Sequence, residues 1–223
     1  SIDITGRHPK SARGNVYMLT VVDHFSRWAE AIPIRNHTAP TVAKALLTIV
    51  FSRYGCPLQL LSDQGPEFES ELFSQLMKSL DVEKLRTSPY QPSTNGVCER
   101  FHGTLNRMLA KAVSESQRDW DTKIPMVLMA YRASRHTSTG YSPNRLFLGR
   151  ENCLPIDLVL GRPKDRVKFS STTDEFVQAR EAEIEAAFRL ARGHCKVTAE
   201  RRKKTYDVRV KEQFQYRRLG ILL

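Results

Sequence analysis

The chain has 223 residues, 40% of them hydrophobic, which is enough to bury a sizeable core without disulfide or metal cross-links. Its net charge of +11, from 35 basic and 24 acidic side chains, favours a polyanionic partner, most often nucleic acid. Its apolar runs are far shorter than the roughly 20 residues of a membrane span, and its first six residues lack a secretory pattern, so we expect a soluble intracellular protein.

The first third of the chain alternates strand and helix patterns. Residues 16–22 and 28–34 are apolar, β-rich runs that predict two strands joined by a polar turn. Residues 36–38 then offer a helix cap, Pro40 suits the first helical turn, and Gly55 is placed to end the helix.

Strand and helix patterns continue to alternate in the next segment. Short apolar runs at 58–61 and 82–87 predict two more strands, with an amphipathic helix between them at 67–80. Residues 88–96 contain two prolines and a glycine and are expected to form a loop, which leads into a helix at 97–114. This alternation predicts an α/β layer with parallel neighbouring strands.

The rest of the chain has helical patterns. Helices are predicted at 120–133 and 142–149. The polar residues 161–173 have the composition of a linker, and a long helical pattern runs from residue 174 to about residue 204. We interpret this last helix as an arm that packs on a partner or on the core.

The basic excess is concentrated at the carboxyl-terminal end. Residues 189–223 contain 11 basic and 3 acidic side chains, whereas residues 1–112 contain 13 basic and 10 acidic ones. The net charge thus indicates a class of partner without locating an active site. The four cysteines lie more than 40 residues apart, which excludes a finger-type zinc site formed by this chain alone and gives no sign of a disulfide framework.

Three carboxylates stand out by their context. Asp3 lies between Ile2 and Ile4 in the first predicted strand, so its side chain points away from these apolar neighbours. Asp63 ends the fourth predicted strand, and in α/β sheets ligands bind at the carboxyl ends of strands. Glu99 lies at the start of the helix that follows the predicted loop.

The predicted helix of Glu99 has two distinct faces. Its apolar stripe is predicted to consist of Val97, Phe101, Leu105, Met108 and Ala112. The face of Glu99 also contains Gly103, Asn106 and Ala110, which are small or polar and could approach a substrate.

Carboxylates brought together in this way would repel one another unless protons or cations lay between them. Mg²⁺ prefers a few carboxylates with water and phosphate oxygens, and two such ions about 3.5–4 Å apart can stabilise both oxygens of a phosphoryl transfer. A single Asp or Glu is nevertheless most often a solvated surface group or a helix cap. By composition, Asp23 and Asp81 are nearly as well placed.

The spacing of the three carboxylates resembles a known family pattern. Asp3, then Asp63, then Glu99 after 35 intervening residues are similar to the D,D(35)E pattern of retroviral and long-terminal-repeat retrotransposon integrases. Three segments resemble the gypsy class of this family, in the same order as in that class. They are residues 10–17 (KSARGNVY), 22–28 (VDHFSRW) and 88–100 (SPYQPSTNGVCER).

The resemblance implies a ribonuclease-H-like α/β fold with a five-stranded mixed sheet flanked by helices. It also implies two Mg²⁺ or Mn²⁺ ions held by Asp3, Asp63 and Glu99. The implied reaction is attack by water near the 3′ end of the element DNA, followed by attack of the freed 3′-hydroxyl on target DNA. Further implications are a dimer or higher oligomer, action in the nucleus, and neither a membrane nor a small-molecule substrate.

Several residues are candidates for DNA contact. Tyr90 and Asn95 match loop positions that lie against the DNA end in the family, and three basic residues follow on the next helix: Arg100, Arg107 and Lys111. Retroviral members often have lysines four and seven residues after the glutamate, where this chain has Gly103 and Asn106.

A basic cluster on the last predicted helix has three open interpretations: contact with phosphate, nuclear import, or a solvated helix face. The cluster consists of Arg201, Arg202, Lys203 and Lys204.

The resemblance also predicts the domain organisation. Residues 1–160 would form the catalytic core, 161–173 a linker, and 174–223 a basic helical extension that stops before the expected small barrel. The zinc-binding amino-terminal domain of the family has no counterpart among these residues.

Two other functions remain as alternatives to a catalytic integrase core. One is a captured, non-catalytic integrase-like domain that binds DNA or a protein partner, although all three carboxylates are present. The other is a ribonuclease-H-type nuclease without strand transfer, which would not account for the predicted loop.

Overall fold

The computed structural model of the protein describes residues 1–87, 96–155, 157 and 173–219, without the side chains of 173–177 and 209–219. The chain divides into two compact units, Ser1–Ala133 and Ser134–Leu223. The predicted linker lies outside the described residues except for Thr173, and so does the predicted loop except for Gly96. The predicted domain boundaries stay predictions.

Five strands form two hydrogen-bonded sheets in the first unit. The first sheet is antiparallel and contains β1 (Ile2–Gly6), β2 (Tyr17–Val22) and β3 (Ala29–Ile34). The second sheet is a parallel pair, β4 (Gln59–Ser62) and β5 (Glu83–Arg86). All five predicted strands are present, and the four with predicted bounds begin and end within one residue of them.

The expectation of one five-stranded sheet is wrong for the described residues. No backbone pairing joins β1 to β4 among them, although the two strands lie against each other. Ile2 of β1 and Leu60 of β4 belong to the same buried cluster. Side-chain packing therefore holds the two sheets together where a hydrogen-bonded ladder was expected.

The helix predicted to end at Gly55 contains a π-helical segment. It begins as α1 (Ala39–Ala45), continues as η1 (Leu46–Phe51) and ends as α2 (Ser52–Tyr54). Pro40 lies in the first turn as predicted. Gly55 has a positive φ of 79°, a conformation that glycine adopts without a steric cost.

The helix predicted at 67–80 is interrupted near its beginning. The structure has a short α3 (Pro66–Glu69) and then α4 (Glu71–Ser79). Ser70 separates them because its backbone is extended and its hydroxyl accepts a hydrogen bond from the backbone N–H of Phe73, at 3.2 Å. A serine that caps a helix in this way competes with continuation of the preceding turn.

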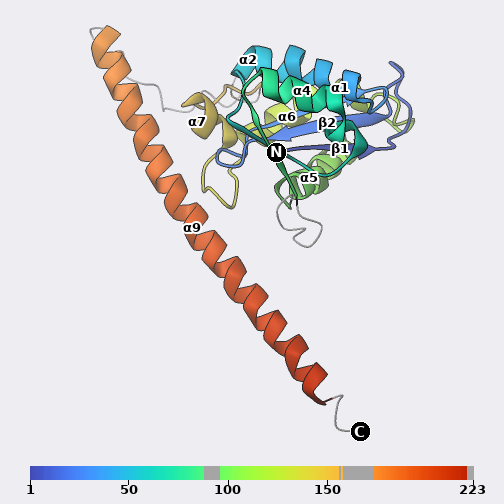
Figure 1. Ribbon diagram of the computed structural model, residues 1–223. Helices are drawn as coiled ribbons and strands as arrows, with labels where there is room; N and C mark the ends of the chain where they lie inside the picture. The colour runs from blue at the N-terminus through green and yellow to red at the C-terminus, as the bar shows by residue number, and fades with distance from the viewer. Residues whose placement is uncertain (88–95, 156, 158–172, 220–223) are drawn as a thin grey trace. The chain divides into compact units, whose positions relative to one another are not determined.

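Helices cover both faces of the antiparallel sheet, which makes three layers (Figure 1). On one face, buried side chains of β1–β3 pack with α1, η1 and α4 around Leu19, Leu46 and Phe73. On the other face, Met18 and Val22 pack against α5 (Gly96–Ala112) and α6 (Trp120–Ala133). Successive residues of β2 therefore face opposite layers, as the strand pleat requires.

The apolar stripe of α5 differs from the prediction by part of a helical turn. Its buried hydrophobic residues are Cys98, Phe101, Leu105 and Leu109. Val97 and Met108 are only partly buried, and Ala112 is exposed. Cys98 and Leu109 thus replace the outer members of the predicted stripe, while Glu99 and Gly103 remain on the exposed side.

The second unit contains α7 (Pro143–Leu148) and α9 (Thr173–Leu219). Ser142 caps α7 by accepting a hydrogen bond from the backbone N–H of Arg145, at 3.0 Å. Arg145 also contacts Glu183 of α9 at 3.5 Å. The long helix extends beyond the predicted end near residue 204, and no described helix has the length and apolarity to cross a membrane.

We predict that Met77→Ala, on the buried side of α4, lowers the free energy of unfolding by about 2–5 kcal/mol, because it leaves a cavity in the core. Leu72→Ala on the same helix should change it by about 0.5 kcal/mol or less, since Leu72 is 46% exposed. Urea denaturation of both variants measures the difference. Equal effects would contradict the burial pattern of α4.

Candidate active site

Asp3 is the second residue of β1 and points toward the layer that contains α5. Ile2 and Ile4 belong to the opposite core cluster, which confirms the predicted alternation. The backbone N–H of Ile4 donates a 2.8 Å hydrogen bond to Asp3 Oδ1. The Asp3 side chain is 16% exposed, so most of it is removed from water.

The environment of Asp3 favours its neutral form. The pKa of Asp3 is raised from 3.8 to about 6, mainly by burial, and the hydrogen bond from the Ile4 N–H opposes this rise. Nearby negative charges contribute the rest of this rise, and they belong to Asp63, Glu99 and Glu67 in decreasing order of effect. The structure therefore brings the three predicted carboxylates into one electrostatic neighbourhood, together with a fourth that was not predicted.

Asp63 immediately follows β4, at the carboxyl end of the parallel pair. Its Oδ1 accepts a 3.1 Å hydrogen bond from the backbone N–H of Gly65, which closes a tight turn into α3. A Cβ atom at residue 65 would lie 3.1 Å from Asp63 Oδ1 and 3.1 Å from the carboxyl carbon of Glu67. Glycine thus allows two carboxylates to flank the same backbone position.

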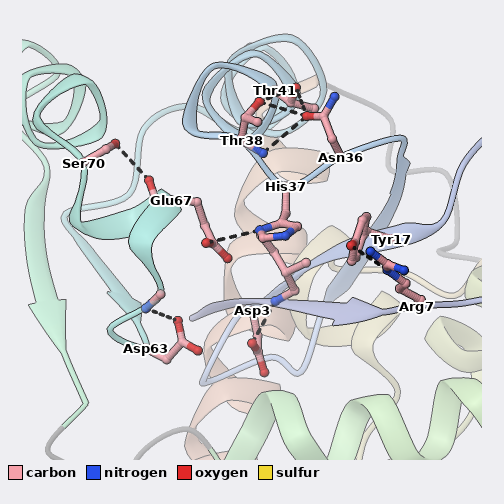
Figure 2. A network of polar contacts seen from close by, with 12 residues as sticks. Asp3, Arg7, Tyr17, Asn36, His37, Thr38, Thr41, Asp63, Glu67 and Ser70 are labelled. Carbon is pink, nitrogen blue, oxygen red and sulfur yellow. Dashed lines mark hydrogen bonds and ion pairs between the residues drawn. The ribbon is translucent and has the colours of Figure 1, made fainter.

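Glu67 is the carboxylate that the sequence patterns missed. Its side chain is 10% exposed, and its Oε2 lies 3.4 Å from His37 Nδ1. Figure 2 shows Glu67 turned toward His37, with Asp63 and Asp3 on the neighbouring elements. The available signal was its place four residues after Asp63, directly before the buried Phe68.

Glu99 lies in the first turn of α5 and is exposed. A carboxylate in the first turn interacts favourably with the positive end of the helix dipole. The side chain of Glu99 is the most open of the three predicted ligands to a substrate in solvent.

Asp23 and Asp81, which composition alone does not distinguish from these carboxylates, lie elsewhere in the fold. Asp23 Oδ2 accepts hydrogen bonds from the backbone N–H and the hydroxyl of Ser26, at 2.7 and 2.6 Å, so it stabilises the β2–β3 turn. Asp81 precedes β5 and lies at the amino end of the parallel pair, opposite the end that carries Asp63.

His102 on α5 faces Asp3 and was also missed. Its Nδ1 lies 3.7 Å from Asp3 Oδ2, and its Nε2 lies 2.6 Å from the hydroxyl of Thr20 on β2. Burial lowers the pKa of His102 to about 4, with a smaller contribution from His8. The ring is therefore neutral at physiological pH and does not neutralise the carboxylates.

The chemistry of this donor set suits a hard divalent cation, because carboxylate oxygens predominate. Among the described residues, however, no group of three or more His, Cys, Asp and Glu side chains lies close enough together to hold one metal ion. The charges of the carboxylates thus interact, but the carboxylates do not form a complete set of ligands for one metal ion.

Comparisons of the sequence and of the structure with known proteins point to the same family. Residues 1–92 match the family described as integrase core domain. The chain is 28% identical over 211 residues to the retrovirus-related Pol polyprotein from transposon 412 of Drosophila melanogaster, covering 95% of this chain and 17% of that protein. It is 34% identical over 169 residues to the Pol polyprotein of Radiation murine leukemia virus, covering 75% of this chain and 27% of that protein.

Two solved structures extend this likeness. The catalytic core domain of BIV integrase is 27% identical, with a TM-score of 0.52 over 66% of this chain and 91% of that chain. The chain belongs to the integrase core family. The HTLV-2 integrase catalytic core domain in complex with magnesium has the same fold, at 21% identity and a TM-score of 0.52, over 64% of this chain and 90% of that chain.

These comparisons confirm the expected family and the mixed α/β, ribonuclease-H-like fold class. The integrase core spans less than a third of the length of either Pol polyprotein.

The predicted DNA contacts of the integrase core fall in three places. Tyr90 and Asn95 lie outside the described residues. Three basic residues lie exposed on α5, in the same unit as the carboxylates: Arg100, Arg107 and Lys111. The basic cluster lies exposed on α9 in the second unit, where Arg202 donates a 3.0 Å hydrogen bond to the hydroxyl of Ser138.

The raised pKa of Asp3 yields a prediction for the metal-free integrase core. Because the folded-state pKa lies above the unfolded value, ionisation of Asp3 opposes folding increasingly as the pH rises from about 4 to about 6. We expect Asp3→Asn to raise the melting temperature at pH 7.5 and to leave it unchanged below about pH 4. Thermal unfolding from pH 4 to pH 8 measures this difference.

Asp119→Asn provides a control of opposite sign. The backbone N–H of Ser114 holds the pKa of Asp119 below its usual value, so this carboxylate stabilises the fold above its unfolded pKa. Its substitution should slightly lower the melting temperature at pH 7.5. If Asp3→Asn also lowered the melting temperature at that pH, the raised pKa of Asp3 would be refuted.

Proposed function

We propose that this chain is the catalytic core of a DNA integrase, a polynucleotidyl transferase that depends on divalent metal ions. The observation behind the proposal is the convergence of Asp3, Asp63, Glu99 and Glu67 from four separate elements. Such crowding disfavours ionisation of a structural carboxylate. It is useful where cations and phosphate oxygens enter the site together.

The metal ligands in this proposal are Asp3, Asp63 and Glu99, holding two Mg²⁺ or Mn²⁺ ions. The integrase core of HTLV-2, whose structure contains magnesium, supports the choice of ion. When bound, such ions would stabilise the negative charge on the attacking and leaving oxygens of the phosphodiester. The ligands would have to move closer together to hold the ions, because among the described residues they do not form a complete set of ligands.

The side chains of the protein have complementary roles. Asp3 is held on the sheet and Asp63 on a tight turn, and each accepts a hydrogen bond from a nearby backbone N–H. Glu99 is exposed at the start of α5 and would complete the site when DNA is present. The proposed reactions are attack of water near the 3′ end of element DNA, and then attack of the freed 3′-hydroxyl on target DNA.

DNA binding outside the site is assigned to basic side chains. We place Arg100, Arg107 and Lys111 on the path of the DNA end, with Tyr90 and Asn95 of the preceding segment. The basic cluster of α9 contributes further phosphate contacts. The proposal includes a dimer or higher oligomer and action in the nucleus, where target DNA resides.

Cleavage of a branched DNA that mimics an integration product tests the catalytic proposal. The chain should cleave it with Mg²⁺ or Mn²⁺, and Asp63→Asn should reduce the rate by about 100-fold or more, since transition-state contacts of this kind contribute several kcal/mol. Asp81→Asn is the matched control, because residue 81 has a positive φ that asparagine tolerates and lies at the other end of the sheet.

Two results would refute catalysis by this chain: equal cleavage by the Asp63→Asn variant, or no cleavage by any form at any metal concentration. The second result, combined with intact DNA binding, would favour the alternative of a non-catalytic integrase-like domain. A branched substrate is preferred because it does not require a complete integration reaction.

The basic cluster of α9 predicts a change in the salt dependence of DNA binding. Substituting Arg201, Lys203 and Lys204 with Gln should lower the slope of log K against log salt concentration by roughly 2–3 units, about 0.9 for each phosphate that the protein no longer neutralises. Fluorescence anisotropy between 50 and 300 mM salt measures the slope.

A second triple variant controls for the removal of three charges. Lys44, Arg53 and Lys78 are exposed on helices of the first unit, and their substitution with Gln removes the same net charge. The slope should then change by less than about 1 unit, since no phosphate contact is assigned to these residues. Equal changes in both variants would contradict a specific role for α9.

A further inference from the structure

A pocket of about 240 Å³ lies between α5, the β1–β2 loop and the beginning of α6. No residue that lines it belongs to the proposed metal site. Its lining on the helices and on the segment between them is apolar apart from two side-chain amides, and consists of Asn106, Leu109, Ala110, Val113, Gln117 and Trp120. Asn106 and Ala110 share the face of α5 that carries Glu99, so the pocket and the candidate active site lie on one side of this helix.

The wall formed by the β1–β2 loop is held in place by hydrogen bonds to the end of the α5–α6 connection. Trp120 Nε1 donates to the carbonyl oxygen of Pro9 at 2.7 Å. The backbone N–H of Ala12 donates to the carbonyl oxygen of Arg118 at 2.9 Å. The pocket is therefore formed before any ligand arrives, as binding sites for small groups usually are.

The chemistry of the lining suits a planar ring with polar edges. The rings of His8 and Trp120 lie 4.9 Å apart at one wall, and His8 is only half-buried, so part of its ring is open to a ligand. Apolar and aromatic walls of this kind stack with nucleobases, and side-chain amides such as those of Asn106 and Gln117 can pair with the edge of a base. The volume is smaller than the roughly 300–1,000 Å³ of sites for drug-sized molecules, which suits a single ring system.

The charge around the pocket favours a nucleotide over a neutral ligand. The two segments that contain most of its lining, residues 7–13 and 106–118, have one acidic side chain, that of Glu115. Their six basic side chains are all exposed: Arg7, Lys10, Arg13, Arg107, Lys111 and Arg118. Basic side chains around an apolar pocket attract the phosphates on either side of a base, while the pocket takes the base itself.

We propose that this pocket receives one unpaired nucleobase of the DNA on which the integrase core acts. The inference rests on the proposed function for the identity of the substrate. A paired base is stacked on both faces and hydrogen-bonded along its edge, so only an unpaired base can offer these groups to the pocket.

The distance along α5 specifies which nucleotide the pocket takes. Asn106 and Ala110 follow Glu99 by seven and eleven residues, which is about 10–17 Å along the helix axis. A DNA strand advances about 3.4 Å per nucleotide. The base in the pocket therefore belongs to a nucleotide roughly three to five positions from the phosphate that reacts.

The first test measures DNA binding in EDTA, so that no cleavage is required. The probe is branched DNA with one extra unpaired adenine at successive positions from the junction, and the reference has an abasic nucleotide in its place. The 223-residue chain should bind the adenine form about 5–100-fold more tightly, since stacking of one base contributes on this scale. The preference should be greatest at three to five nucleotides. Equal binding of the adenine and abasic forms at every position would overturn the proposal.

Two phenylalanine substitutions on α5 separate the pocket from general DNA binding. Ala110→Phe fills the pocket and should abolish the preference for adenine, while affinity for the abasic DNA stays within about 3-fold. Ala112→Phe is the matched control, because Ala112 is also exposed on α5 but does not line the pocket, and it should retain the preference. Equal melting temperatures check that both variants fold. A preference that survives Ala110→Phe would overturn the proposal.

The second test locates the base through the two tryptophans of the chain. In ¹H–¹⁵N spectra, the indole N–H of Trp120 should shift with the adenine DNA and much less with the abasic DNA, because a base in the pocket adds its ring current. The indole N–H of Trp28, which does not line the pocket, serves as an internal reference. Equal shifts of Trp120 with both DNAs would indicate contact with the backbone alone and would overturn the proposal.

Failure of this inference and failure of the proposed function give different results. A chain that prefers adenine DNA but cleaves nothing with Mg²⁺ or Mn²⁺ would refute catalysis and leave the pocket assignment intact. A chain that cleaves branched DNA but binds the adenine and abasic forms equally would refute only the pocket. Absence of DNA binding would refute both.

Discussion

The burial of Asp3 beside other carboxylates is the constraint on which the candidate site of the first unit depends. The pKa of Asp3 is raised because its side chain is buried and because other negative charges lie near it. The surrounding elements tolerate this crowding by local means: a glycine at residue 65, a helix terminus beneath Glu99, and His37 beside Glu67. Burying a carboxylate in such a site destabilises the fold, and the apolar packing of the three-layer core offsets this destabilisation.

Because of the strand pleat, the two faces of the antiparallel sheet carry different side chains. On β2, Leu19 faces the cluster around α1 and α4, whereas Thr20 faces α5 and reaches His102. Asp3 lies opposite Thr20 in the strand register, so the two polar residues emerge on the same face. The apolar cluster on the far face can hold the strands in place without contributing any group to the site.

Local patterns predicted most of this arrangement, and the failures have physical causes. Strand positions and the direction of Asp3 followed from alternation of apolar residues, and Asp63 followed from its place after a short strand. Glu67 and His102 escaped prediction because their roles arise from tertiary contacts with His37, Asp3 and Thr20, which no spacing encodes. The prediction of a single five-stranded sheet was wrong for the described strands, because packing and not backbone pairing joins Ile2 to Leu60.

The side-chain packing between the two sheets also determines how Asp3 and Asp63 are held relative to each other. Asp3 belongs to the antiparallel sheet and Asp63 follows the parallel pair, and among the described strands no backbone ladder fixes one to the other. Apolar contacts resist sliding far less than a ladder of directional bonds does. The separation of Asp3 and Asp63 therefore depends on side-chain packing, and the size of the side chains at residues 2 and 60 would change it.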